Sequence, residues 1–534
     1  MSSNPERITL TALLAKAAEE FPHQKAVIVP GKYQLLYSDL QRIVDVCAAQ
    51  LKCAGIAQGD VVALSFPISI EFVILFMAVI RARGVAAPLN AAYTAEEFEF
   101  YLQDSQSKLL LLPSEGNAAA ESAAVNLKLA TVGARFCNSA DAAGFIQFLP
   151  KSAGLNIHSS AEAEAEAVAF NNSADDVALF LHTSGTTSRP KGVPLSQVNL
   201  AASTQHIKDT YELSTSDATV ITLPLFHVHG LVAALLSSLV AGATVVLPAA
   251  GRFSASIFWK DMKTHGATWY TAVPTIHQIL LDRHSVKPEG TYPKLRFIRS
   301  CSASLAPVIL ERLENAFGAP VLEAYAMTEA SHQMTSNPLP QHGPRKPGSV
   351  GKPTGLEVGI LDESGVPQPQ GSSGEVCIRG SNVTNGYLNN PEANKTAFQF
   401  GWFHTGDLGY LDEEGYLFLI GRIKELINRG GEKISPLEVD AVLLTHPDVA
   451  HAVAFAVPDE KYGEEINAAV VGQEGVTVNG NDIICYCKKY LATFKIPKKV
   501  FVTESLPKTA SGKIQRRVMA EHFGVAVRPN RLGA

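Results

Sequence analysis

The sequence has no excess of positive charge. Its 45 lysine and arginine residues stand against 51 aspartate and glutamate residues, which gives a formal net charge of −6 over 534 residues. A chain with this balance has no overall field that could hold a polyanion such as nucleic acid. Nucleic acid is therefore not an expected partner, and any anionic ligand must be bound by local basic groups.

Cysteine is also scarce. The seven cysteines are widely scattered, at Cys47, Cys53, Cys137, Cys301, Cys377, Cys485 and Cys487. Their odd number and wide spacing are typical of reduced thiols in an intracellular protein. The spacing of the last two is too short for a typical zinc ligand pair.

No targeting segment is visible. Residues 5–7 (Pro-Glu-Arg) are followed by no long apolar run, which argues against a signal peptide or an arginine-rich transit peptide. Residues 532–534 (Leu-Gly-Ala) differ from the S-K-L signal of peroxisomal import. We expect a cytoplasmic protein that acts as a monomer.

One apolar run, residues 231–250, has about the length that spans a bilayer, roughly 20 residues. Ser237 and Ser238 lie in its middle, residues 241–243 (Ala-Gly-Ala) interrupt it, and residues 244–247 are rich in β-branched side chains. These features favour a buried helix followed by a short buried strand. A membrane helix is the less favoured alternative.

The composition, 46% hydrophobic and 18% charged, favours a globular protein. Its length suggests two to four domains. Strand-like runs at 60–65, 85–89 and 108–112 alternate with a helical stretch at 70–83, as in α/β layers. Alanine-rich stretches at 118–125 and 161–169 are expected to be surface helices or loops.

A change in composition marks the expected domain boundary. Residues 401–415 are dense in glycine, aspartate and glutamate, and strand-like runs at 452–457 and 468–471 and a helical stretch at 482–491 follow. We predict an α/β protein with a large N-terminal domain of layered sheets and helices, residues 1–423, and a small mobile C-terminal α+β domain, residues 424–534.

The strongest motif is residues 183–192, Thr-Ser-Gly-Thr-Thr-Ser-Arg-Pro-Lys-Gly, which follows the apolar run 177–181. Small hydroxyl residues and glycines allow backbone N–H and side-chain O–H groups to converge on a polyphosphate, and Lys191 adds a positive charge. Pro190 stands where the P-loop motif requires a glycine. A plain exposed turn would explain any three of these residues, but not the whole run.

This segment resembles the phosphate loop of the adenylate-forming superfamily, which includes acyl-CoA synthetases, peptide-synthetase adenylation domains and beetle luciferases. Residues 323–329, 401–407 and 507–513 resemble three further motifs of that superfamily, in the same order. The resemblance implies that a carboxylate attacks the α-phosphorus of ATP, and that a thiol then displaces AMP from the acyl-adenylate. ATP, Mg²⁺ and coenzyme A are the implied cofactors.

The resemblance assigns a role to each motif. The phosphate loop would hold the β- and γ-phosphates, residues 325–329 the adenine, the α-phosphate and Mg²⁺, and the carboxylate at 407 the ribose hydroxyls. A glycine pair at 430–431 would line the path of coenzyme A, although an ordinary turn is the alternative. The implied binding residues are Thr183, Ser184, Gly185, Thr186, Thr187, Lys191, Tyr325, Thr328, Glu329, Asp407, Arg422, Gly430, Gly431 and Lys433.

The implied catalytic residues are Lys513, His227, Thr328 and Glu329. In the superfamily's pattern, the ammonium of Lys513 bridges the substrate carboxylate and the α-phosphate in the transition state. Lys424 occupies the position of a hinge, about which the small domain rotates between the two half-reactions. In isolation, Lys513 would be one surface lysine among many.

The expected acyl pocket is polar, with His227, His229, Ser302 and His332 as its substrate-binding residues. A single histidine is more often structural, whereas several in one pocket favour an anion. Charge-assisted hydrogen bonds, worth about 1.5–3 kcal/mol each, discriminate strongly against a substrate that lacks the acceptor. The pocket therefore suits a short acid with two carboxylates.

Along residues 223–252, 268–304, 317–351 and 401–440, the chain resembles plant and fungal oxalate–CoA ligases more than coumarate or fatty-acid ligases. The resemblance implies that oxalate and coenzyme A are joined into oxalyl-CoA. Ala326, in place of the superfamily's usual glycine, departs from the wider pattern. Alternatives are a ligase for another short or aromatic acid, a luciferase-like oxygenase and a non-catalytic nucleotide-binding protein.

Overall fold

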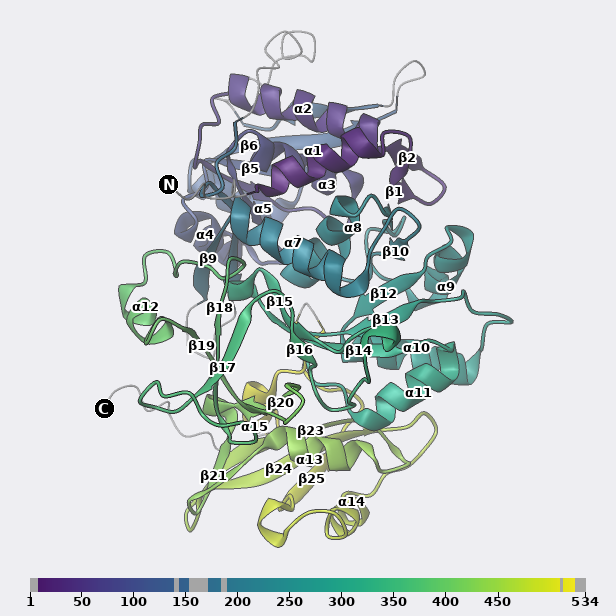
Figure 1. Cartoon of the computed structure of the whole chain (residues 1–534), viewed down its shortest axis with the longest axis vertical. Helices are drawn as coiled ribbons and strands as arrows, with labels where there is room; N and C mark the ends of the chain where they lie inside the picture. The colour runs from purple at the N-terminus through teal and green to yellow at the C-terminus, as the bar shows by residue number, and fades with distance from the viewer. Residues whose placement is uncertain (1–7, 139–143, 153–170, 184–189, 510–511, 524–534) are drawn as a thin grey trace.

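The computed structural model describes residues 8–138, 144–152, 171–183, 190–509 and 512–523. Figure 1 shows a large N-terminal part, coloured purple to green, and a smaller green-to-yellow unit at the opposite end. Within the described residues, three sheets belong to the large part and one to the small unit. The fold is of the predicted α/β class.

The first sheet has seven described strands in the order β7-β6-β5-β3-β4-β8-β9. Its inner pairs are parallel, and both edge pairs, β6/β7 and β8/β9, are antiparallel. The strands are β3 (Val61–Leu64), β4 (Val85–Pro88), β5 (Leu109–Pro113), β6 (Ala130–Cys137), β7 (Phe145–Pro150), β8 (Val177–Thr183) and β9 (Lys191–Ser196).

The sequence predictions in this region are confirmed. The three strand-like runs form β3, β4 and β5, and the helical stretch forms α3 (Ile70–Arg81), which Ser69 caps by accepting a hydrogen bond from the Phe72 N–H. The alanine-rich stretch at 118–125 forms the helix α5 (Ala118–Asn126), which packs one face against β5. The stretch at 161–169 lies outside the described residues.

The second sheet has nine described strands in the order β16-β15-β14-β13-β12-β10-β11-β1-β2. Its central strands, β14 to β1, are parallel, so their carboxyl ends meet at one edge, where ligands of open α/β sheets bind. The strands are β1 (Lys25–Val29), β2 (Tyr33–Leu36), β10 (Ala218–Val220), β11 (Thr244–Val246), β12 (Trp269–Ala272), β13 (Phe297–Ser300), β14 (Val321–Met327), β15 (His332–Ser336) and β16 (Lys352–Pro353).

The long apolar run is buried between these sheets, as predicted. It forms a π-helical segment, η1 (His229–Leu236), which continues into α8 (Ser237–Val240) and then β11. The hydroxyls of Ser237 and Ser238 each donate a hydrogen bond to the carbonyl four residues earlier, so neither is left unpaired in the core. In the described part of the chain, no helix is long and apolar enough to cross a membrane.

A four-stranded sheet, β17-β18-β19-β20, completes the large part, and the small unit has its own sheet, β22-β21-β24-β23, with β25 paired to β24. The small unit also has its own apolar core, which includes Ile434, Val439 and Ile466. The strands are β17 (Glu357–Leu361), β18 (Gly374–Arg379), β19 (Phe403–Leu411), β20 (Leu417–Arg422), β21 (Ile427–Arg429), β22 (Glu432–Ile434), β23 (Val449–Asp459), β24 (Gly463–Gly472) and β25 (Lys499–Val502).

The remaining helices pack on the faces of these sheets. The helix predicted at 482–491 is α14, which ends at Cys487. The helices are α1 (Leu10–Glu20), α2 (Tyr37–Cys53), α4 (Ala95–Asp104), α7 (Gln197–Tyr211), α9 (Ala255–Thr264), α10 (Pro274–Val286), α11 (Pro307–Phe317), α12 (Pro391–Ala397), α13 (Pro436–Leu444), α14 (Gly480–Cys487) and α15 (Met519–His522), with short 3₁₀ turns η2 (Thr328–Ala330), η3 (Pro340–His342), η4 (Ile423–Glu425), η5 (Thr493–Lys495) and η6 (Arg516–Val518).

Candidate active site

The predicted phosphate loop lies between β8 and β9. Thr183 ends β8 and pairs with Lys191 at the start of β9. The four loop residues Ser184, Gly185, Thr186 and Thr187 lie outside the described residues. Both ends of the loop are thus placed at the edge of the first sheet.

Lys191 lies among the charges of the expected phosphate site. Its Nζ is 4.5 Å from the centroid of the Tyr387 ring. Burial lowers the pKa of Lys191, the Glu329 carboxylate opposes this shift, and the charge of Lys424 adds to it. The structure therefore brings the predicted hinge residue close to the base of the phosphate loop.

Glu329 is positioned so that its carboxylate could act as an oxygen ligand. It is buried in η2, directly after β14 and Thr328, and its Oε1 accepts a hydrogen bond of 2.8 Å from the Tyr387 hydroxyl. A buried carboxylate beside Lys191 offers the hard oxygen that Mg²⁺ prefers. The residues present therefore fit the magnesium ion that the resemblance implies.

The predicted ribose-binding carboxylate, Asp407, is buried on β19 opposite Arg422 of β20. Burial raises the pKa of Asp407, and the Arg422 guanidinium, whose Nε lies 3.2 Å from Oδ1, counteracts this effect. The Tyr325 hydroxyl donates a hydrogen bond to Oδ2. The structure thus brings Tyr325, Asp407 and Arg422 together, as expected from the motifs.

Beside Asp407, strands β18 and β19 carry a cluster with the donor types of a metal site, Glu375, Cys377 and His404. These groups bond to one another: His404 Nδ1 lies 2.8 Å from Glu375 Oε2 and 3.4 Å from Cys377 Sγ. Glu375 Oε1 also accepts a 2.9 Å hydrogen bond from the Gly406 N–H. The cluster thus holds Gly406, the residue directly before Asp407 on β19.

Three of the four residues of the predicted acyl pocket are close to one another. His229 Nδ1 lies 2.9 Å from Ser302 Oγ, and the rings of His229 and His332 meet edge to face with centroids 5.0 Å apart. The fourth residue, His227, accepts a long hydrogen bond of 3.5 Å from the His229 N–H through Nδ1. They come from separate elements: His227 from the loop before η1, His229 from the start of η1, Ser302 from the loop after β13 and His332 from the start of β15.

His332 is the most informative of these side chains. It is fully buried, yet neither ring nitrogen has a hydrogen-bond partner in the described part of the chain. Its backbone φ is 109°, in a region that costs a side chain strain, and Ser302 has a φ of 75°. Buried polar groups are nearly always paired, so these unpaired nitrogens point to a bound ligand.

The three histidines are neutral near pH 7. Burial and the charge of Lys513 lower the pKa of His227 to about 3. Burial likewise lowers the pKa of His229 and of His332 well below the ordinary range, and nearby cations, Arg299 and Lys513, add to the effect. The acyl pocket is thus a ring of neutral donors and acceptors between two positive groups.

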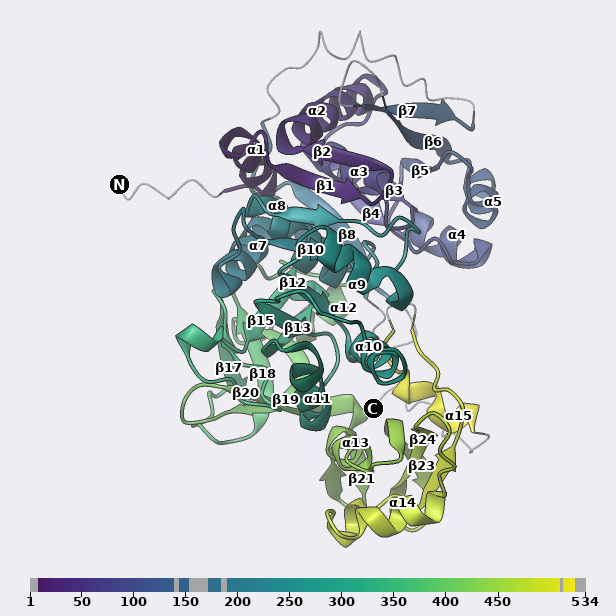
Figure 2. The ribbon, with the colours of Figure 1, turned by 90° about the vertical axis from the view of Figure 1, so that its right-hand side faces the viewer.

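Lys513 reaches this pocket from the small unit. In Figure 2 the yellow segment near the C-terminus extends from that unit toward α10, and Gly512 lies against Thr275 at the start of α10. Burial lowers the pKa of Lys513, Cys301, Asp407 and Glu329 oppose that shift, and Arg422 adds to it. The Lys513 ammonium therefore lies within electrostatic range of His227 and of the carboxylates Asp407 and Glu329.

The predicted coenzyme A residues lie elsewhere. Gly430, Gly431 and Lys433 belong to the β21–β22 hairpin, where both glycines have positive φ. The Gly430 N–H donates to the Tyr462 carbonyl. The hydrogen bonds described for this hairpin stay within the small unit, so this pose does not bring the three residues to the histidines.

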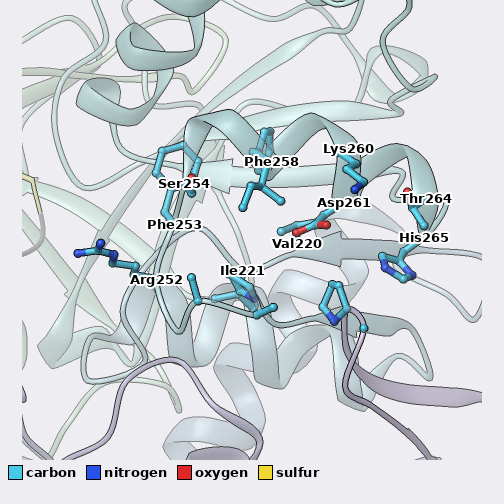
Figure 3. A pocket seen from close by; sticks show the side chains of 16 residues that line it. Val220, Ile221, Arg252, Phe253, Ser254, Phe258, Lys260, Asp261, Thr264 and His265 are labelled. Atoms are coloured by element: carbon cyan, nitrogen blue, oxygen red, sulfur yellow. The ribbon is translucent and has the colours of Figure 1, made fainter.

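A separate cavity of about 390 Å³ lies between α9 and the ends of β10 and β11. Figure 3 shows Phe258 and Asp261 projecting from α9, with Ile221 on the other side. None of the predicted site residues lines it. Among the described residues, this cavity is thus separate from the predicted site.

The model of the AMP-binding enzyme family matches residues 14–388, and that of the AMP-binding enzyme C-terminal domain matches residues 438–513. This chain belongs to the AMP-binding enzyme family. The resemblance to adenylate-forming enzymes is thereby confirmed.

This AMP-binding enzyme is 65% identical over 516 residues to the oxalate–CoA ligase of Arabidopsis thaliana, with 96% of this chain and 98% of the relative covered. It is 44% identical over 524 residues to the oxalate–CoA ligase of Saccharomyces cerevisiae, with 94% and 95% covered. ATP-bound MatB from Rhodopseudomonas palustris has the same fold, with a TM-score of 0.83, 30% identity and 97% and 99% coverage.

Sequence reasoning gave no individual role to several residues around this AMP-binding enzyme's candidate site. Arg299 lies in the segment 268–304 that the resemblance already covered, and in the structure both Arg299 and Thr271 contact His229. The Tyr387 hydroxyl donates to Glu329, and Glu375 accepts from the Gly406 N–H. For Arg299, a sequence signal was available: an arginine inside a buried strand is rare unless its charge is paired or used.

Proposed function

We propose that this AMP-binding enzyme is an oxalate–CoA ligase that forms oxalyl-CoA from oxalate, ATP and coenzyme A, with release of AMP and pyrophosphate. The observation that carries the proposal is His332, whose two buried ring nitrogens have no partner among the described residues and lie within electrostatic range of Arg299 and Lys513. The two relatives named as oxalate–CoA ligases support the same substrate.

The pocket suits the distal carboxylate of a very short diacid. Neutral histidine N–H groups and the Ser302 hydroxyl donate hydrogen bonds, and two flanking cations supply the countercharge. A monocarboxylate of the same length would leave these buried groups without an acceptor, which is costly. A long apolar acid would have to be buried against them.

In the first half-reaction, an oxygen of the reacting carboxylate forms a bond to the α-phosphorus as the bond to pyrophosphate breaks. Lys513 neutralises the negative charge that the two anions bring together, and Thr328 binds the α-phosphate. Asp407 and Arg422 hold the ribose, with Tyr325 against the adenine. Mg²⁺, held by Glu329, would supply charge neutralisation to the phosphates.

For the second half-reaction, we propose that the unit from residue 424 onward rotates about Lys424 and brings Gly430, Gly431 and Lys433 to the active site. Lys424 lies in η4, at the end of β20 and directly before the first strand of the small unit. Both glycines have a positive φ, a conformation that favours glycine. Because glycine has no side chain, the thin pantetheine chain of coenzyme A could lie close to the backbone there.

A panel of acids tests the proposed substrate. The protein is incubated with ATP, Mg²⁺ and coenzyme A and with oxalate, malonate, acetate, octanoate or 4-coumarate, and AMP release and thioester formation are followed. We expect the highest kcat/KM with oxalate. A higher kcat/KM with any monocarboxylate would reject the proposal.

Adenylation should fail at alkaline pH because of Lys513. Its ammonium must be protonated to act, and burial lowers its pKa below the ordinary 10.5. The rate of oxalate-dependent pyrophosphate exchange, measured as kcat at saturating ATP, should therefore fall as pH rises through this lowered pKa. In Lys513→Arg, whose guanidinium stays protonated, the fall should move to higher pH. An unchanged profile would contradict the role of Lys513.

The monomer expected from the sequence also remains a prediction. Sedimentation measurements would test it. The cytoplasmic location expected from the sequence remains a prediction, which imaging of the tagged protein would test.

A further inference from the structure

Arg299 is a fully buried arginine on β13, the strand that leads to Ser302. Its Nε donates to the Tyr211 hydroxyl at 2.8 Å and its Nη2 to Gln333 Oε1 at 3.0 Å. Its Nη1 contacts Thr271 Oγ1 at 3.1 Å and His229 Nε2 at 3.3 Å. In the described part of the chain, these hydrogen-bond partners are all uncharged.

A guanidinium cannot lose its proton in a protein, and a buried charge without a counterion is strongly destabilising. The fold nevertheless keeps this charge beside His229, in the wall of the acyl pocket. The arrangement becomes favourable when an anion enters the pocket. The position of Arg299 therefore indicates a role in ligand binding.

The contacts of Arg299 also decide which nitrogen of His229 carries the proton. A guanidinium has donors and no acceptor, so the nitrogen that faces it, Nε2, must present its lone pair. The proton of the neutral ring then lies on Nδ1, the nitrogen 2.9 Å from Ser302 Oγ. Ser302 Oγ accepts this hydrogen bond, and its own hydroxyl hydrogen is free to point into the pocket.

The opposite tautomer would reverse the chain of hydrogen bonds. With the proton on Nε2, His229 Nδ1 would become an acceptor, and the Ser302 hydroxyl would donate to it. The pocket would then present an oxygen lone pair, which repels a carboxylate. Thr271 Oγ1, 2.6 Å from Nε2, can donate or accept and so does not select a tautomer by itself.

We propose that Arg299 is a positioning residue for the distal carboxylate: it holds His229 in the Nδ1-protonated tautomer and so orients the Ser302 hydroxyl to donate to the substrate. This inference rests on the proposed function for the identity of the anion, but the tautomer of His229 is independent of it.

The test uses Arg299→Met, which keeps length and removes every donor. The ring nitrogens of ¹⁵N-histidine-labelled protein report the tautomer directly, with His229→Gln as the assignment control. The wild-type protein should show His229 with its proton on Nδ1 alone, and the variant should show a mixture. A wild-type ring protonated on Nε2, or an unchanged tautomer in the variant, would overturn the proposal.

Kinetics provide the second readout. In pyrophosphate exchange, Arg299→Met should raise the KM for oxalate about 10- to 100-fold, the size of one lost charge-assisted hydrogen bond, and leave the KM for ATP within about twofold. Equal increases in both KM values would indicate a purely structural role. Arg299→Lys, which keeps a donor and a charge, should recover part of the oxalate affinity and serves as the test if the methionine variant does not fold.

A double-mutant cycle separates action through Ser302 from other effects. If Arg299 acts through that hydroxyl, then Arg299→Met should raise the oxalate KM by a clearly smaller factor in Ser302→Ala than in the wild-type protein, and only the countercharge effect of the guanidinium should remain. Fully additive effects would contradict the proposal. If the wild-type protein fails to prefer oxalate, the proposed function falls, and the ¹⁵N spectrum still decides the tautomer.

Discussion

Lys513→Ala should lower the rate of oxalate-dependent pyrophosphate exchange by at least about 100- to 1,000-fold, the effect of removing one preorganised donor to developing charge. The reason is that the charge of Lys513 interacts both with the pocket histidine His227 and with Asp407 and Glu329, the carboxylates proposed to bind the nucleotide and Mg²⁺. Thioester formation from supplied oxalyl-adenylate and coenzyme A should be spared, because the bond between the carboxylate and the α-phosphorus is then already formed.

Lys508→Ala is the matched control. Lys508 belongs to the same C-terminal loop but is exposed, and its charge interacts with Asp282 and His451. This variant should retain both half-reactions. Equal loss of both half-reactions in Lys513→Ala would contradict the assigned role and indicate a general defect of domain docking.

His332→Ala should raise the KM for oxalate about 10- to 100-fold, because a charge-assisted hydrogen bond to the distal carboxylate is lost. The KM for ATP should stay nearly constant. His332 is fully buried, and both of its nitrogens are unpaired in the described structure, so the ligand is the partner that its position implies. Steady-state kinetics with oxalate and ATP varied in turn will measure both values.

His206→Ala provides the comparison, since His206 is also a histidine with a burial-lowered pKa but lies on α7, against Gly355. It should leave the oxalate KM unchanged. If His332→Ala also leaves the oxalate KM unchanged, His332 does not belong to the pocket.

Local sequence patterns predicted much of the fold because the relevant physics is local. A short run such as 61–64 is buried on both sides of a parallel sheet and is accordingly apolar throughout. Ser237 and Ser238 were compatible with a core helix because each hydroxyl can bond within its own helix. The π-helical form of 229–236 was not predicted, since apolar composition alone does not distinguish it from an α-helix.

The candidate site was predictable only as far as family motifs reach. Tyr325, Asp407 and Arg422 lie in or beside the motifs and come together in the structure. Arg299 lies in the segment 268–304 that carries the resemblance, but its contacts could not be predicted, because Tyr211 and Gln333 are distant from it in sequence. The roles of individual site residues therefore remain proposals that rest on geometry.

The most direct measurement is a crystal structure with a non-hydrolysable analogue of oxalyl-adenylate. The distal carboxylate should lie within hydrogen-bond distance of Ser302 and His332, with the ammonium of Lys513 at the phosphate group. An acyl end outside the histidine pocket, or Lys513 turned away from the phosphate, would contradict the account.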